Sequence, residues 1–290
     1  MQPNIVILAA GIASRMRTPR RTPAGTDARL LREAEEKTKS MIGVGMGGRP
    51  FLDYLIYNVR EAGYTDVVLV VGEESAAMRA HYGERERGNP YHGVTISYAV
   101  QRIPGGRTKP LGTADAVLCA MMSRPDWAET QFTVCNSDNL YSINALRLMR
   151  ETAAPCALID YDRDALGFEP SRIEKFAVLQ TDSEGYLTGI IEKPSPDEIA
   201  RLRGPSGRIG VSMNIFRFAY DLMLQPLKET PLHPVRLEKE IPAALMLLIA
   251  RHPRSVLTIP LAERVPDLTS KEDIAEVQRF LARNYPGFEL

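Results

Sequence analysis

The segment NIVILAAGIASRM, residues 4–16, is an apolar run that ends in a loop of small residues followed by Ser14 and Arg15. The run predicts a buried strand whose carboxyl end opens onto a polyanion site. Backbone N–H groups of small residues can approach phosphate oxygens closely, and Arg15 can add a bidentate positive charge. The alternative interpretation is an ordinary tight turn between strand and helix, because a lone glycine-containing loop is a weak signal.

Short apolar runs alternate with helical patterns as far as about residue 150. The runs that predict further strands are Val67–Val71, Val94–Val100, Phe132–Cys135, Cys156–Tyr161, Phe176–Gln180, Leu187–Ile191, Val211–Phe216 and Val256–Ile259. Such alternation is typical of an α/β fold with a mostly parallel sheet, flanking helices and a site at the carboxyl ends of the strands. The second half is richer in strands, which we expect to form a wall for a second ligand.

The charges of the chain balance, with 36 Lys and Arg against 36 Asp and Glu. Such a protein has no long-range field that draws it to nucleic acid or to an anionic membrane, so an anion site has to be local. No stretch reaches the roughly 18 consecutive apolar residues of a membrane-spanning helix. We therefore expect neither a nucleic-acid partner nor a membrane.

The cysteines and histidines indicate neither a disulfide framework nor a zinc site. Cys119, Cys135 and Cys156 are far apart, and two of them lie in strand-like runs, which predicts buried thiols and a reducing cytoplasm. The four histidines have no short ligand spacing. Residues 1–3 lack the basic start of a signal peptide, so we expect an unexported protein.

Two polar segments, residues 17–38 and residues 83–93, are predicted to be surface loops because both contain glycine and proline. The first follows the proposed phosphate loop directly. It suggests a mobile flap over a bound nucleotide, and a plain solvated insertion is the equal alternative.

Three places in the first half offer groups for a nucleotide. Lys39 follows the first polar segment, although most lysines are simply solvated. Gln101 ends a strand-like run, where a glutamine can present a donor and an acceptor to a base edge. A turn that contains Gly112 and Thr113 opens an apolar helix, and its small residues would let a flat base lie against the backbone.

Two carboxylates are candidates for a metal site. Asp138 follows the strand-like Phe132–Cys135 run, where a hard cation that bridges phosphates would be held. Asp267 is the best second carboxylate, and the alternative for it is a cap on the predicted helix over residues 270–281.

The second half carries groups that suit a phosphorylated, hydroxylated ligand. Glu192 and Lys193 lie at a strand end that is stopped by Pro194. Asn214 is an amide in the apolar Val211–Phe216 run, where burial would require a partner and a sugar hydroxyl would serve. A satisfied core asparagine is the alternative.

In their order along the chain, these segments resemble the sugar-phosphate nucleotidyltransferase family, the nucleoside-diphosphate-sugar pyrophosphorylases. The matching pieces are LAAGIASRM at 8–16, TKSMI at 38–42, YAVQ at 98–101, PLGTADAV at 110–117, NSDNLY at 136–141, IIEKP at 190–194, GVSMNIF at 210–216 and DLTSKED at 267–273. Single pieces are weak signals, but eight of them in the family's order are a strong one.

The resemblance implies a Rossmann-like fold in one domain over residues 1–290, with a nucleotide-binding half to about residue 150 and a sugar-phosphate-binding half after it. It implies transfer of a nucleotidyl group from an NTP, with UTP or dTTP favoured, to a sugar 1-phosphate, which gives an NDP-sugar and pyrophosphate. The partners are these two substrates, and a homo-oligomer is left open. The site residues that the resemblance implies are Arg15, Lys39 and Asp138 for catalysis, Ala10, Gly11, Ser14, Gln101, Gly112 and Thr113 for the nucleotide, Glu192, Lys193 and Asn214 for the sugar phosphate, and Asp138 with Asp267 for Mg²⁺.

The chain departs from the family pattern at three places. Ala13 stands at the usual second glycine, Ser40 at the usual proline after the lysine, and Asn136-Ser137 where glycine-aspartate is frequent. Two other functions therefore stay open. One is a cytidylyltransferase that acts on phosphocholine or a polyol phosphate, and the other is a regulatory protein that binds a nucleotide sugar without turnover.

Overall fold

The computed structural model describes the whole chain apart from residues 1–2, 12–15, 17–26, 174–175, 193, 203–206 and 289. Within the described part, eleven strands form one sheet. They are β1 Asn4–Leu8, β2 Asp66–Val71, β3 Asn89–Tyr91, β4 Val94–Val100, β5 Gln131–Asn136, β6 Cys156–Asp162, β7 Val178–Thr181, β8 Leu187–Ile191, β9 Gly210–Val211, β10 Ile215–Ala219 and β11 Val256–Leu261.

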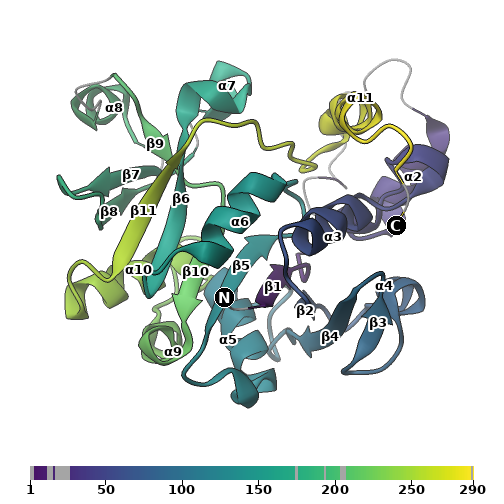
Figure 1. The fold of residues 1–290 in the computed structure, drawn as a ribbon, viewed down its shortest axis with the longest axis horizontal. Coiled ribbons are helices and arrows are strands. Elements are labelled where there is room, and N and C mark those ends of the chain that lie inside the picture. Colours follow the sequence, from purple (N-terminus) through teal and green to yellow (C-terminus); the bar gives the residue numbers. More distant parts are fainter. Residues whose placement is uncertain are drawn as a thin grey trace.

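The sheet has the order β3-β4-β2-β1-β5-β10-β6-β9-β7-β8, and β11 pairs with β6. Strands β4, β2, β1 and β5 run parallel to one another, whereas β10 pairs antiparallel with both β5 and β6. Figure 1 shows the strands of the second half at the left and those of the first half toward the right. The predicted parallel first half and strand-rich second half are therefore confirmed.

Helices cover both faces of the sheet. They are α2 Ala28–Glu36, α3 Phe51–Glu61, α4 Ala76–Tyr82, α5 Thr113–Ser123, α6 Ile143–Glu151, α7 Pro170–Ile173, α8 Pro196–Leu202, α9 Tyr220–Glu229, α10 Ile241–Arg251 and α11 Ile274–Asn284. Short 3₁₀ turns occupy Lys39–Met41, Met46–Gly48, Pro125–Trp127, Arg163–Leu166 and Lys271–Asp273. Among the described residues, no helix combines the length and the apolar character needed to span a bilayer.

The alternation of side chains along β1 shows why the protein has two cores. Ile5 and Ile7 point to one face, where α3, α6 and α11 pack, while Val6 points to the other, where α5, α9 and α10 pack. All three side chains are fully buried. A continuous apolar strand is what a sheet covered on both faces requires, so the run at the start of the chain becomes a central strand.

The two polar segments are not simple loops. Part of the first forms α2, whose N-cap is Asp27, and α2 is attached to its surroundings by ion pairs and backbone contacts. Glu33 accepts a hydrogen bond from the backbone of Gly43 at 2.7 Å, and Glu35 pairs with Lys271 at 2.8 Å. The second segment contains β3, which pairs with β4. Residues 17–26 of the predicted flap lie outside the described residues.

The predicted strand Val211–Phe216 was wrong as a single element. The chain forms β9 and β10 with a turn between them, and Asn214 in this turn has a φ of +58°. Asparagine tolerates this left-handed conformation because its short polar side chain bonds locally. Asn214 is exposed, so it is not a core asparagine. The prediction of buried thiols holds for Cys135 and Cys156 in β5 and β6, while Cys119 is half-buried.

Candidate active site

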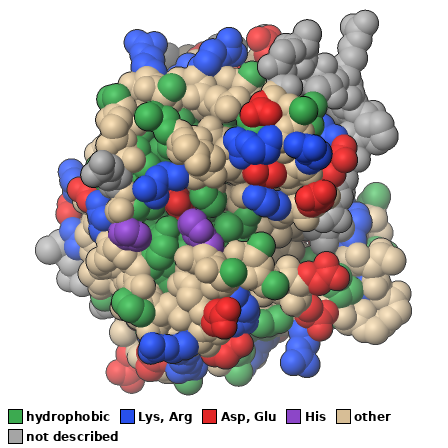
Figure 2. All heavy atoms as spheres, turned by 90° about the vertical axis from the view of Figure 1, so that its right-hand side faces the viewer, with side chains coloured by type: hydrophobic (Ala, Val, Ile, Leu, Met, Phe, Trp, Pro, Cys, Tyr) green, Lys and Arg blue, Asp and Glu red, His purple; other side chains and the backbone are tan. Residues whose placement is uncertain are grey.

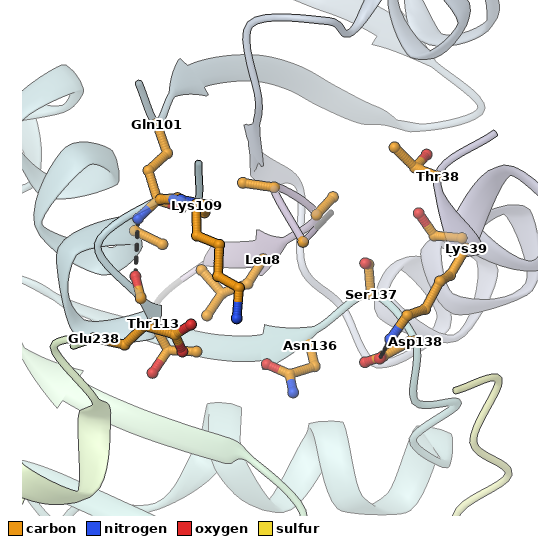
Figure 3. A pocket seen from close by; sticks show the side chains of 17 residues that line it. Leu8, Thr38, Lys39, Gln101, Lys109, Thr113, Asn136, Ser137, Asp138 and Glu238 are labelled. Carbon is orange, nitrogen blue, oxygen red and sulfur yellow. Dashed lines mark hydrogen bonds and ion pairs between the residues drawn. The ribbon is translucent and has the colours of Figure 1, made fainter. Parts of the chain in front are cut away.

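A cavity of about 220 Å³ opens at the carboxyl ends of β1, β4 and β5 and reaches the start of α5. It brings together seven predicted site residues, namely Ala10, Gly11, Lys39, Gln101, Gly112, Thr113 and Asp138. Figure 3 shows Gln101 and Lys39 at opposite ends of this cavity. Parallel strands place their carboxyl ends at one edge, so residues far apart in sequence meet there.

Lys39 and Asp138 form an ion pair at one end of the cavity. The distance between Lys39 Nζ and Asp138 Oδ2 is 3.0 Å, and the two side chains are only 14% and 21% exposed. Lys39 comes from the 3₁₀ turn before α3, and Asp138 lies two residues beyond β5. In such a pair the lysine ammonium suits an anionic ligand. The carboxylate suits the metal cation that would accompany that ligand.

Asp267 lies beside Asp138 because the backbone segments that carry them are bonded to each other. The Leu268 N–H donates to the Asp138 carbonyl at 2.8 Å, and Asn139 and Asp267 form an isolated antiparallel bridge. Burial, and then the charge of Asp138, raise the pKa of Asp267 to about 6. A carboxyl group whose ionisation is opposed by a neighbouring carboxylate would be relieved by a divalent cation between them.

Asp267 does not cap the following helix. That role belongs to a capping box in which Asp273 accepts from the Ser270 backbone at 2.6 Å. Instead, Asp267 Oδ1 accepts from the Thr269 hydroxyl at 2.5 Å. The capping alternative is therefore wrong.

Arg172, which the sequence analysis did not single out, forms an ion pair with Asp267. Its guanidinium donates to Asp267 Oδ2 and to Asp273 Oδ1, each at 2.5 Å, and it lies 4.6 Å from the ring centroid of Phe168. Arg172 also counters the rise in the pKa of Asp267. No sequence signal marked it, because α7 is a short helix 95 residues before Asp267.

Gln101 offers an acceptor rather than both kinds of group. Its Nε2 donates to the Gly112 carbonyl and to Asp115 Oδ2, each at 2.8 Å. Both partners are acceptors, so the amide orientation follows from the network. The prediction that Gln101 presents a free donor to a base is corrected, since both N–H groups are in use and the carbonyl oxygen remains.

The glycine turn before α5 is held by the segment that leads into α10. Gly112 has a φ of +107°, and a Cβ there would lie 2.5 Å from the Lys239 carbonyl oxygen. That carbonyl accepts from the Ala114 N–H at 3.0 Å, and the Thr113 hydroxyl accepts from the Ile241 N–H at 3.1 Å. Thr113 therefore anchors α10 as well as lining the cavity.

Lys109 and Glu238 also line the cavity, although the sequence analysis did not assign them. Figure 3 shows the Lys109 amine pointing toward the middle of the cavity. Its place directly before the PLGT turn was the signal that could have found it. Glu238 had no comparable signal, because its loop joins the cavity only through the fold.

Glu192 lies apart from this cavity, in a neighbouring one of about 260 Å³ to which Glu238 also contributes. There Arg236 pairs with Glu192 and, at 2.5 Å, with Glu240. His233, near both carboxylates, accepts backbone N–H groups at Nδ1. These contacts, from one guanidinium and from the backbone of the same loop, hold the cluster together.

Of the other predicted sugar-phosphate residues, the structure describes Asn214 but not Lys193. Asn214 directly precedes β10, whose Ile215 pairs with Cys135, one residue before the cavity-lining Asn136. It therefore lies exposed near that edge of the sheet. Ser14, Arg15 and Lys193 lie outside the described residues.

Comparison with known proteins gives relatives of one kind. The UTP–glucose-1-phosphate uridylyltransferase AglF of Haloferax volcanii is 29% identical over 178 residues, which are 59% of this chain and 63% of AglF. The glucose-1-phosphate adenylyltransferase of Koribacter versatilis is 23% identical over 207 residues, 70% of this chain and 48% of that protein. The chain thus spans about half to two thirds of the length of these relatives.

Solved structures share the fold over nearly the whole chain. The UTP-bound UGPase from Acinetobacter baumannii has a TM-score of 0.70 at 18% identity, covering 99% of this chain and 95% of that one. A UDP-glucose pyrophosphorylase complexed with UDP-glucose has a TM-score of 0.68 at 17% identity, covering 98% and 99%. The family model described as nucleotidyl transferase matches residues 24–282. With this match and the cavity described above, the chain belongs to the nucleotidyl transferase family.

Proposed function

We propose that the protein transfers a nucleotidyl group from an NTP, with UTP or dTTP favoured, to a sugar 1-phosphate, giving an NDP-sugar and pyrophosphate. The observation that carries the proposal is one cavity with Lys39, Asp138 and the adjoining Asp267 at one end and the anchored Gln101 at the other. One end suits phosphates and metal, and the other suits a base. The named activities of the relatives support the same reaction class.

We propose Mg²⁺ as the cofactor, held by Asp138 and Asp267. The fit rests on the two carboxylates themselves, since the Asp267 side chain is only 11% exposed and its pKa is raised by burial and by Asp138. Hard oxygen donors with excess negative charge are what Mg²⁺ prefers. When bound, Mg²⁺ supplies positive charge that offsets the charge of the triphosphate.

The residues of the chain act mainly by positioning and by charge. The attacking phosphate oxygen and the α-phosphorus both belong to anionic groups, so repulsion and misalignment are the main obstacles. Lys39, with Arg15 on the triphosphate and Lys193 on the sugar phosphate, would reduce that repulsion. In-line attack at the α-phosphorus then expels pyrophosphate, and holding both anions contributes roughly 7 kcal/mol or more. No covalent enzyme intermediate is required.

The preference for UTP or dTTP has support from Gln101. Its free carbonyl oxygen accepts a hydrogen bond from the N3–H group of uracil or thymine, whereas N3 of cytosine carries no hydrogen. The N4 amino group of cytosine could donate to the same oxygen, so the cytidylyltransferase alternative stays open. For the sugar, we propose Glu192 and Asn214 as hydrogen-bond partners of its hydroxyl groups. Glu192 would exchange its ion pair with Arg236 for a hydrogen bond to the ligand. The three free cysteines suit a reducing cytoplasm, where we propose that the protein acts.

The test measures pyrophosphate release across five NTPs and the 1-phosphates of glucose, mannose and N-acetylglucosamine, with and without Mg²⁺. We expect one productive pair that contains UTP or dTTP, and loss of turnover by about 10³-fold or more in Asp138→Asn. Glu84→Gln, which changes an exposed carboxylate outside the cavity, is the control and should keep full activity. Binding of NTP without any release of pyrophosphate would favour the non-catalytic regulator.

A further inference from the structure

Lys109 is a cation that the proposed reaction has not yet used. It lines the cavity of about 220 Å³ that the proposed function assigns to the nucleotide, which we call the nucleotide cavity. Among the described residues that line this cavity, the basic side chains are Lys39 and Lys109. Lys39 is engaged with Asp138 at 3.0 Å. Lys109 is exposed, and within the described part of the chain its ammonium group has no ion pair and no hydrogen bond. It is therefore free for an anion.

The backbone that carries Lys109 is held on both sides. Arg107 donates through Nε to the Lys109 carbonyl at 3.3 Å and through Nη2 to the Leu237 carbonyl at 2.6 Å. Two residues after Lys109, the Leu111 carbonyl accepts from the Lys239 N–H. Lys109 thus starts from a fixed position between β4 and α5, and only its flexible stem has to adjust to a ligand.

The position of Lys109 along the cavity decides which part of a nucleotide it can reach. Figure 3 shows Gln101 at one end, Lys39 and Asp138 at the other, and the Lys109 ammonium group between them. In an NTP, the α-phosphate is the first phosphate after the nucleoside. With the base at Gln101 and the triphosphate extending toward Lys39 and Asp138, the α-phosphate comes opposite Lys109.

The protein surface does not supply positive charge to this point from a distance. Figure 2 views the side on which α2 and α11 lie in Figure 1, and basic and acidic side chains are mixed over its upper half. The formal charges of the whole chain also balance, at 36 against 36. Without an extended field, the charge that meets the α-phosphate has to come from groups inside the cavity.

We propose that Lys109 is a catalytic residue that contacts a non-bridging oxygen of the α-phosphate and stabilises its charge during transfer. The proposal rests on the proposed function. In the transfer, a sugar-phosphate oxygen forms a bond to the α-phosphorus, the bond from this phosphorus to the bridging oxygen breaks, and the electron pair leaves with pyrophosphate. Lys109 gives up no proton and acts as a compact positive charge. Its effect therefore falls on the rate of transfer more than on NTP binding.

The first test removes the charge. Lys109→Met keeps an unbranched apolar stem, and its kcat with the productive pair of substrates should fall by about 100-fold or more. The KM for NTP should stay within about threefold, because the lost contact acts in the transition state. Lys109→Arg keeps a positive charge and should recover part of the rate. The matched control, Lys228→Met, changes an exposed lysine of α9 outside the cavity and should keep the full rate.

Phosphorothioate substrates separate a contact with the α-phosphate from a structural effect. In the two diastereomers of UTPαS or dTTPαS, sulfur replaces one or the other non-bridging oxygen of the α-phosphate. Lys109→Met should change the ratio of the two rates by about fivefold or more, since the lost charge faces only one of these oxygens. A structural role would lower both rates alike.

The outcomes separate this proposal from the proposed function. An unchanged kcat in Lys109→Met, or a lower kcat with the ratio of the diastereomers unaltered, would overturn the role of Lys109 while turnover by the wild type upholds the proposed function. Absence of transfer by the wild type with every pair of substrates would overturn the proposed function and, with it, the role of Lys109.

Discussion

At the scale of single residues, Asp267 is set between opposing influences. Burial and Asp138 disfavour its charged form, while Arg172 and the Thr269 hydroxyl favour it. The result is a carboxyl group whose pKa is raised to about 6. Because this pKa lies just below neutral pH, little free energy is needed to deprotonate Asp267 at pH 7. The carboxylate can then accept a cation.

The first prediction concerns the pH dependence of stability in metal-free protein. A folded pKa of about 6, above the value of 3.8 for an ordinary aspartate, contributes stability below about pH 4 that is lost as the pH rises through about 6. Asp267→Asn does not titrate. The free energy of unfolding of the wild type minus that of Asp267→Asn should therefore fall by about 2 kcal/mol between about pH 4 and pH 7. Urea denaturation at each pH measures it, and a constant difference would contradict the assignment.

At the scale of elements, the nucleotide cavity depends on contacts between segments that are not neighbours in sequence. The turn before α5 is bonded to the segment before α10, since the Lys239 backbone N–H donates to the Leu111 carbonyl at 2.5 Å. Gly112 allows this approach. In the sequence, Gly112 is simply a glycine before a helix. The residue that requires a glycine there, Lys239, is about 127 positions later in the chain.

Gly112→Ala tests that contact. The new Cβ would lie 2.5 Å from the Lys239 carbonyl oxygen and the backbone would keep a φ of +107°, so we expect a loss of about 1–3 kcal/mol. The KM for NTP should rise as well. Gly105→Ala is the matched control, because its Cβ would meet no atom within 4 Å. Equal stability of the two variants, measured by urea unfolding, would show that the turn relaxes freely.

Arg217 links β10 to the end of α6. It is 4% exposed, and its Nη1 donates to the carbonyls of Met149 and Arg150 at 2.8 and 2.9 Å. Arg217→Met keeps the apolar stem but leaves these carbonyls without their donor. We expect the free energy of unfolding to fall by about 2–3 kcal/mol. Arg147→Met, at an exposed position of α6, should change it by less than about 0.5 kcal/mol.

At the scale of the whole molecule, the proposed substrate and metal would join parts of the chain from β1 to the segment before α11. Lys39, Asp138 and Asp267 come from three separate connections, each anchored to one sheet. A ligand that contacts all three binds only the folded chain. Ligand binding and global stability are therefore linked.

The corresponding prediction is a shift in thermal stability. UTP with Mg²⁺ at about 100 times its Kd should stabilise the fold by about 2.7 kcal/mol and raise the Tm by several degrees. The Asp138→Asn variant should show a much smaller shift with Mg²⁺ present. Differential scanning calorimetry measures both, and an equal shift in the variant would remove Asp138 from the metal site.

The sequence by itself determined the α/β class, the parallel first half, the core of β1 and the cluster of Lys39, Gln101, Gly112 and Asp138 at one edge of the sheet. It did so because periodicity and turn residues are local signals, and because parallel strands bring their carboxyl ends together. Only the tertiary structure decided which groups hold Asp267, the roles of Arg172 and Lys109, the groups that occupy the Gln101 donor, and the break between β9 and β10. Those features join residues about a hundred positions apart, or depend on the left-handed turn at Asn214, and no local pattern encodes which segments will meet.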